Sequence, residues 1–391
     1  MKKLSILFFL IIITTTSFAQ LASNPWEGKK NYGFFNTLEL NFGHGSFLKN
    51  SATLDEIMDN PYSDIALRIG IQSTGARQWE QILGYPIYGM GFYGAYFYEN
   101  DPLGTPSAIY LFINAPIKRW NKFSFKYDLG TGLSYGFNPY DSINNPDNNV
   151  ISARKNVYFH LKVFAEYEIS KRMDLSLGFG MNHFSNGSTQ TPNLGINLVN
   201  FNINARYHFN PVKSYTKHID PNYQPAVRPE FIVNEIPKTE HYHEFSIYYA
   251  AGGKATTEQY SDGPIYFISA LAVDYHYKYF HIAHIGAGID YFYEAARREW
   301  VEDPTFSDMT YVGLHISHIL YFSRLALVVE PGIYLSNNVA DKDDIYLRVG
   351  GRYDVTERFY IQAALKTRNG AVADFIEWGL GYRIPFAYSK R

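Results

Sequence analysis

The chain of 391 residues is rich in aromatic residues (17%) and poor in charged ones (18%), and its formal net charge is -2. A chain this close to neutral offers no basic field for nucleic acid, and the absence of cysteine excludes a disulfide framework and a thiolate metal site. Many short aromatic segments with few charges are typical of an outer-membrane β-barrel, in which each strand gives only a weak signal.

Residues 1–19 have the features of a secretory signal peptide. Two lysines precede the apolar run 4–13, and residues 17–19 form a small-x-small cleavage pattern. We therefore expect cleavage after Ala19 or Gln20 and export of the mature chain. The apolar run is too short for a retained membrane helix, and no cysteine follows the expected cut to carry a lipoprotein anchor.

After the leader, apolar and polar residues alternate with a period of two, which predicts antiparallel strands and an all-β fold. The strands expected in the first half are 31–44, 64–73, 86–98, 107–115, 123–136, 156–169, 173–185 and 196–209. The strands expected in the second half are 241–250, 264–276, 279–293, 309–322, 325–336, 344–354, 358–367 and 372–385. Long or polar connections mostly alternate with short ones, as in bacterial barrels that have long external loops and short periplasmic turns.

Residues 210–239 interrupt the alternation with five prolines and predict an extended linker. The mature chain therefore divides into a first barrel (20–209), the linker and a second half (240–391). Two closed eight-stranded barrels would account for the strands. A single transmembrane barrel of about sixteen strands with a periplasmic excursion would account for them equally well.

The two halves resemble each other at two places. Tyr167–Arg172 resembles Tyr353–Arg358, each a tight turn between penultimate strands, and Asn186-Gly187 recurs as Asn369-Gly370. The second half is thus interpreted as a degenerate repeat of the first, although convergent barrel turns would look similar. Residues 366–368, Lys-Thr-Arg, stand where the first half has His-x-Ser, so a copy would have lost that motif.

In the strand 173–185, odd positions are apolar and even positions are small or polar. In a membrane barrel the apolar row meets lipid and the polar row fills the lumen. His183, Ser185 and Asn197 are all odd and extend the lipid-facing row at the extracellular end. A hairpin register symmetric about Thr191 would place Ser185 beside Asn197.

His183 and Ser185 are candidates for nucleophilic catalysis. Strand residues i and i+2 point the same way, so the histidine can act as general base for the serine hydroxyl. A third group must orient the imidazole, and an Asn side chain or the amides near Asn186 and Gly187 can supply donors for the developing negative charge. The alternative is that His183 and Ser185 have no catalytic role and are polar residues at the barrel rim, level with the lipid headgroups.

The His-x-Ser pattern occurs three times and is weak alone. In His315-Ile-Ser317 the apolar positions are even, so this pair is expected to form hydrogen bonds in the lumen. His44-Gly-Ser46 continues an outward row at the end of the first strand. We expect it in a loop, with an accessory role as the alternative if the first strand closes on the eighth.

The segment His183–Asn186 (His-Phe-Ser-Asn), followed by Pro192-Asn193 and a polar residue at Asn197, resembles the active-site signature of the lipid A 3-O-deacylase (PagL) family of acyloxyacyl hydrolase-like outer-membrane proteins. The resemblance covers about residues 30–210. Members of that family are eight-stranded barrels that use a Ser–His–Glu triad on the lipid-facing wall. They release the ester-linked acyl chain at the 3-position of lipid A.

The resemblance implies that Ser185 is the nucleophile, His183 the base and Asn193 an oxyanion donor, with Asn186 and Gly187 as further donors or positioning groups. This chain departs from the family at the third member, where Asn197 occupies the position of the glutamate. A neutral amide can orient a histidine, but it stabilises an imidazolium less than a carboxylate does. The nearby acidic residues stand at even-numbered positions, so their side chains are expected to point into the lumen; they are Glu166, Glu168 and Asp174.

The sequence therefore predicts a serine esterase integral to the outer membrane of a Gram-negative bacterium. It would act on lipid A or lipopolysaccharide in the outer leaflet without a metal or other cofactor. One alternative is a catalytically inactive barrel with a structural, lipid-binding or transport role. Another is a porin of about sixteen strands. The acyl-chain preference, the ester position and the oligomeric state stay open.

Overall fold

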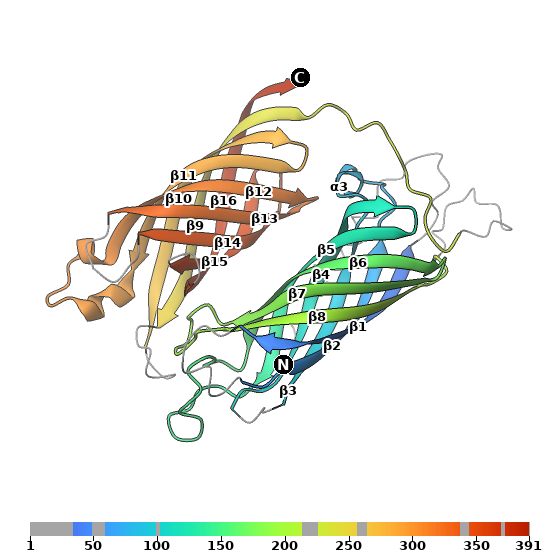
Figure 1. The fold of residues 1–391 in the computed structure, drawn as a ribbon. Helices are drawn as coiled ribbons and strands as arrows, with labels where there is room; N and C mark the ends of the chain where they lie inside the picture. Colours follow the sequence, from blue (N-terminus) through green and yellow to red (C-terminus); the bar gives the residue numbers. More distant parts are fainter. Residues whose placement is uncertain are drawn as a thin grey trace, which may run out of the picture.

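The computed structural model describes residues 34–48, 59–98, 102–212, 226–255, 264–336, 344–368 and 372–390. Within these residues, sixteen strands form two closed antiparallel barrels of eight strands each (Figure 1). Of the two architectures that the sequence left open, the pair of barrels is the observed one. The expected signal peptide, residues 1–19, lies outside the described residues.

Both barrels are simple up-and-down arrangements in which each strand pairs with its neighbours in the chain. The first comprises β1 (Phe35–Phe47), β2 (Tyr62–Gln72), β3 (Ile87–Phe97), β4 (Gly104–Trp120), β5 (Phe123–Phe137), β6 (Asn156–Ser170), β7 (Met173–Ser185) and β8 (Ile196–His208). The second comprises β9 (Glu240–Ala255), β10 (Ile265–Phe280), β11 (Ala283–Glu294), β12 (Thr310–Phe322), β13 (Leu325–Ser336), β14 (Ile345–Asp354), β15 (Phe359–Arg368) and β16 (Val372–Lys390). The β1–β8 and β9–β16 pairings close the two barrels.

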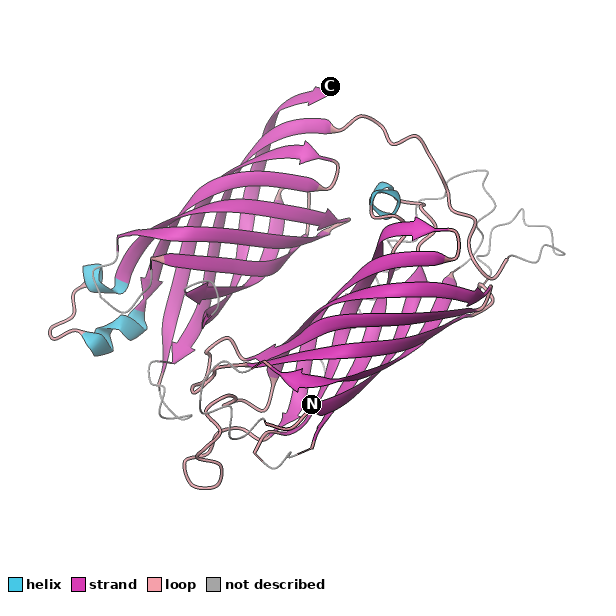
Figure 2. Cartoon of the chain, viewed as in Figure 1, coloured by secondary structure: helices cyan, strands magenta, loops and turns pink. Residues whose placement is uncertain are grey.

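Three short helices in the connections were not predicted (Figure 2). They are α3 (Gln78–Ile82), η1 (Ala295–Trp300) and η2 (Phe306–Met309). Across the described ranges, no helix combines the length and the apolar character that crossing a membrane requires.

The strand faces follow the predicted parity. On β7, the outward Leu177 is 59% exposed, whereas the inward Ser176 is 4% exposed. The second barrel repeats the pattern, with Ile247 55% and Ser246 2% exposed on β9. Apolar rows of this kind surround both barrels. An apolar outer surface is what a barrel needs to lie in lipid.

Paired charges fill the lumen of the first barrel. The Arg68 guanidinium contacts Glu39 at 3.2 Å and Asp128 at 2.7 Å, and Arg206 contacts Glu39 and Glu166, each at 2.5 Å. An eight-stranded barrel encloses only enough space for its own side chains. The porin of about sixteen strands is therefore excluded for this chain.

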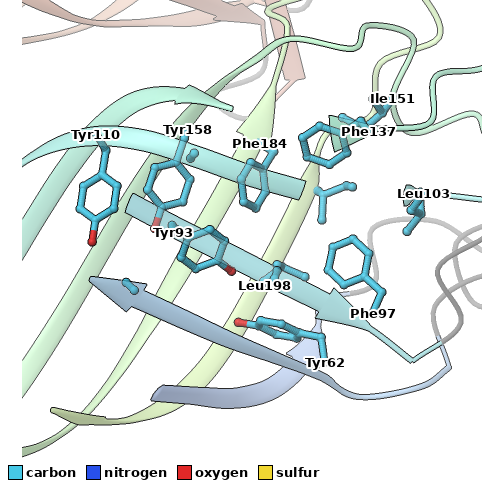
Figure 3. Packing of buried hydrophobic residues seen from close by; sticks show 14 of the residues in the cluster. Tyr62, Tyr93, Phe97, Leu103, Tyr110, Phe137, Ile151, Tyr158, Phe184 and Leu198 are labelled. Carbon is cyan, nitrogen blue, oxygen red and sulfur yellow. The ribbon is translucent and has the colours of Figure 1, made fainter. Parts of the chain in front are cut away.

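Aromatic side chains fill the same lumen at its loop end, beneath the β7–β8 hairpin (Figure 3). Phe184 is fully buried among them, with ring centroids 5.1 Å from Tyr158, 5.3 Å from Phe137 and 5.9 Å from Tyr93. This packing fixes the end of β7 from the inside.

The described part of the linker, residues 226–239, packs along the turn end of the first barrel. The Ile232 N–H donates to the Thr74 carbonyl at 2.8 Å, and Phe231 stacks on Tyr85 at 4.2 Å between centroids. The chain then enters β9, and the two barrels lie side by side (Figure 1). At this end they are joined by a hydrogen bond of 3.0 Å from Gln78 Nε2 in α3 to His281 Nδ1 in the β10–β11 turn.

Candidate active site

The β7–β8 hairpin sets the geometry of the candidate site. His183 pairs directly with Asn197 across the two strands, and the ladder ends at the pair Phe184 and Ile196. Ser185 pairs instead with Val157 on β6. The expectation that Ser185 would lie beside Asn197 is wrong, because the register is shifted by two residues and places His183 opposite Asn197.

Phe184 orients the two residues beside it. Its ring points into the lumen and is buried there, so the flanking His183 and Ser185 belong to the outward face, as parity predicted. Below them the same outward row continues through Met181 and Phe179, the latter 46% exposed. An imidazole and a hydroxyl are thus brought to the apolar outer wall.

The imidazole of His183 is held by one hydrogen bond. His183 Nδ1 lies 2.6 Å from Asn197 Oδ1. A carbonyl oxygen can only accept, so Nδ1 carries the proton and Nε2 keeps a lone pair. This is the tautomer that a general base needs.

Two donors converge on the Ser185 hydroxyl. Its Oγ accepts from the Gly187 N–H at 3.1 Å and from Asn193 Nδ2 at 2.9 Å, and the residue is 4% exposed. In the described part of the chain, no hydrogen bond joins His183 to Ser185. The structure brings Gly187 and Asn193 to the serine oxygen and places the imidazole on the same face.

Asn186 acts on the neighbouring donor rather than on the serine. Its N–H donates to Asn193 Oδ1 at 3.3 Å, which turns the amide nitrogen of Asn193 toward Ser185. Its own side chain donates to Ser152 Oγ at 3.1 Å and to the Gln190 carbonyl at 3.0 Å. Asn186 therefore belongs to the framework of the loop.

Gly195 is a site residue that the sequence did not reveal. Its φ is +73°, and a Cβ there would lie 3.2 Å from His183 Cε1 and 3.7 Å from Ser185 Cβ. The backbone of Gly195 thus passes against both residues. A glycine immediately before the second strand of a hairpin was the available signal for a close approach.

The two other His-x-Ser pairs lie elsewhere. His315 and Ser317 are buried in the second lumen, where His315 Nδ1 is 2.7 Å from Asp290 Oδ2, and the prediction of lumen hydrogen bonding is confirmed. The placement of His44 in a loop is wrong, because β1 extends to Phe47 and includes it. His44 Nδ1 bonds Ser63 Oγ at 3.0 Å on the outer wall.

The neighbouring acidic residues do not replace the missing glutamate. Glu166 pairs with Arg206, and Asp174 lies 2.7 Å from His208, both inside the barrel. Glu168 is 3.7 Å from Arg228 at the turn end. The predicted inward direction is confirmed for Glu166 and Asp174. Among the described residues, no cluster of three or more His, Cys, Asp or Glu side chains has a metal-binding arrangement.

A cavity of about 520 Å³ lies beside the hairpin loop. Its lining residues are Pro139, Tyr140, Ser152, Ala153, Arg154, Lys155, Thr189 and Gln190. Ser152 is the residue that accepts from Asn186, so the cavity adjoins the framework of the candidate site. Close by, backbone N–H groups of Asn144 and Ile143 donate to Asp141 and lower the pKa of its carboxyl. The lining of the cavity itself carries two cationic side chains, Arg154 and Lys155.

The comparisons with solved structures give matches of low similarity. A mutant of the Rh. blastica porin is 12% identical with a TM-score of 0.20, and covers 90% of this chain and 100% of its own. The P. putida toluene transporter TodX is 8% identical with a TM-score of 0.17, and the match covers 93% of this chain and 91% of TodX. No curated protein matches significantly.

Family models match both barrels. Residues 65–206 match the model for lipid A 3-O-deacylase (PagL), and residues 243–386 match that for the acyloxyacyl hydrolase C-terminal domain (PagL_C). Both descriptions name hydrolases of ester-linked acyl chains, and the β-barrel fold fits a protein of the Gram-negative outer membrane. The first barrel is therefore similar to the lipid A 3-O-deacylase (PagL) family, and the second to the acyloxyacyl hydrolase C-terminal domain family.

Proposed function

We propose that this protein is an outer-membrane serine esterase that removes the 3-O-linked acyl chain from lipid A. The observation that carries the proposal is the convergence of the Gly187 N–H and Asn193 Nδ2 on Ser185 Oγ, on the outer wall and next to His183. Donors beside the nucleophilic oxygen lie near the ester carbonyl oxygen that becomes an oxyanion on attack, and can stabilise it by turning from the serine to that oxygen.

In the proposed reaction, His183 Nε2 takes the proton of Ser185 Oγ as this oxygen attacks the ester carbonyl carbon. The carbonyl oxygen becomes an oxyanion that accepts from Gly187 N–H and Asn193 Nδ2. The protonated His183 then gives its proton to the departing sugar oxygen, leaving the acyl chain on Ser185. Water, deprotonated by His183, attacks the carbonyl carbon of this acyl-enzyme; the bond to Ser185 Oγ then breaks, His183 returns its proton to Oγ, and the free fatty acid leaves. Asn197 holds the ring throughout.

The outward position of the site supports a substrate that arrives from the membrane. The apolar rows of β6, β7 and β8 lead up to His183, so an acyl chain can lie along the wall with its ester at the rim. The long loops at this end correspond to the extracellular side of bacterial barrels. Lipid A in the outer leaflet meets both conditions, and residues 1–19 would direct the chain there as a cleaved signal peptide.

The cavity beside the loop is suited to bind a polar lipid headgroup. Arg154 and Lys155 line it, and Thr189 and Gln190 of the hairpin form another part of its lining. Cationic side chains at this position suit the phosphorylated disaccharide of lipid A.

Mass spectrometry of lipid A tests the proposal. Cells that make lipid A are compared with and without the wild-type chain, and with Ser185→Ala and His183→Ala. We expect loss of one 3-hydroxyacyl chain with the wild type alone. If the wild type removes no acyl chain, the esterase proposal is overturned and an inactive barrel is favoured. The neutral Asn197 in the position of the family's glutamate is the observation that supports this alternative. Loss that persists with Ser185→Ala would overturn the mechanism.

A further inference from the structure

We propose that the second barrel positions the oxyanion loop, Asn186–Gln190, and that Ile376 is the positioning residue. The catalytic consequence rests on the proposed esterase function, whereas the structural part stands independently of it. The second barrel would thereby contribute to a reaction whose candidate nucleophile and base both lie on the first.

Hydrogen bonds join the loop to the rim of the second barrel. Ser188 Oγ donates to the Ala373 carbonyl on β16 at 2.8 Å. The Ala255 N–H, at the end of β9, donates to the Ser188 carbonyl at 3.4 Å. β9 and β16 are the two strands that close the second barrel, so the loop contacts a continuous part of its wall.

The closest contact is made by Gly187. A Cβ on this residue would lie 2.3 Å from Ile376 Cγ1 and 3.2 Å from Leu365 Cδ1. The Gly187 backbone therefore packs directly on these two outward side chains, at a φ of +64° that also favours glycine. The same residue donates its N–H to Ser185 Oγ at 3.1 Å. One residue thus carries both the contact with the second barrel and the hydrogen bond to the nucleophile.

This arrangement makes the position of the donor dependent on Ile376. Gly187 has no side chain to anchor it, and its conformation is one that few other residues adopt. A shortened side chain at position 376 would leave a gap behind the Gly187 Cα. A small displacement of a catalytic group costs rate without weakening ground-state binding.

The kinetic test uses the full-length protein in vesicles that contain lipid A. Ile376→Ala is compared with Leu380→Ala, which shortens an outward side chain on the same strand that is 59% exposed. We expect Ile376→Ala to lower kcat about tenfold while KM stays within about twofold. Ile376→Val should restore most of the rate, and Leu380→Ala should leave it unchanged. An increase in KM at unchanged kcat would overturn positioning and make Ile376 a wall of the acyl-chain site.

A second measurement does not depend on enzymatic activity. Amide hydrogen exchange of residues 186–190 is followed by mass spectrometry in the same vesicles. Exchange should be about tenfold faster in Ile376→Ala than in the wild type, because local opening becomes easier, and unchanged in Leu380→Ala. Unchanged exchange in Ile376→Ala would overturn the inference. If activity survives in Ser185→Ala, the proposed mechanism fails, while the exchange result still decides whether the second barrel holds the loop.

Discussion

His183 and Asn197 face each other directly across β7 and β8, with Nδ1 2.6 Å from Oδ1. Side chains of a directly opposed pair are neighbours on one face of the sheet, so the strand register itself brings these two groups together. The amide fixes the tautomer of the imidazole. It carries no charge, so the imidazolium of the proposed reaction would receive less stabilisation than a carboxylate would give.

Replacing this amide by a carboxylate should maintain or increase the rate. If Asn197→Glu stabilises the imidazolium by about 1.4 kcal/mol, kcat rises roughly tenfold. The rate of fatty-acid release from lipid A in vesicles measures the effect. Asn197→Ala is the control, and it should fall below the wild type because the ring loses its partner. A decline of Asn197→Glu to background would show that Asn197 does not occupy the orienting position.

The strands were predictable because their signal is local. Alternation on β7 gave its bounds, Met173–Ser185, directly, since a strand exposed to lipid on one side and to a polar lumen on the other alternates strictly. The helices α3, η1 and η2 were not predictable. They are short and lie in connections, where side chains have no periodic environment to reveal them.

The face of the candidate site followed from parity, but its register did not. Parity places His183, Ser185 and Asn197 on the outer wall in either register. Which residue of β7 lies opposite Asn197 depends on the path of the loop between Phe184 and Ile196, where Gly187 and Gly195 have positive φ values. The contact of Gly187 with Ile376 depends on how two closed barrels dock, and no local pattern encodes that.

Removing one donor to the serine oxygen should lower the rate without weakening substrate binding. Asn193→Ala deletes the hydrogen bond of 2.9 Å to Ser185 Oγ. We expect kcat to fall by about 10²–10³ with KM nearly unchanged, as for other oxyanion donors. Steady-state kinetics on lipid A vesicles measure both constants. Asn144→Ala, an exposed amide in the β5–β6 connection, is the matched control and should retain full activity. A loss confined to KM would assign Asn193 to substrate binding.

Shortening the inward residue between His183 and Ser185 should destabilise the first barrel. Phe184 is fully buried against Tyr158, Phe137 and Tyr93. Phe184→Ala should lower the free energy of unfolding by about 3–5 kcal/mol through lost contacts and a cavity. Urea titration of the folded barrel in vesicles measures this. Ile143→Ala, at a residue 85% exposed in a loop, should change it by less than about 0.5 kcal/mol. Equal effects of the two changes would contradict the anchoring role of Phe184.

Reversing the charges that line the cavity should weaken binding of a phosphorylated headgroup. Arg154 and Lys155 line the cavity beside the loop, and each cationic side chain near anionic lipid contributes about 1 kcal/mol. Combining Arg154→Glu with Lys155→Glu should therefore raise KM for lipid A by roughly 30-fold, with kcat kept within about twofold. The increase should shrink at high salt and disappear with a dephosphorylated substrate. A double change with the same charge difference at the opposite end, Lys122→Glu with Lys171→Glu, should leave KM unaltered. Equal increases for both double variants would show that the effect comes from overall charge and not from a headgroup site.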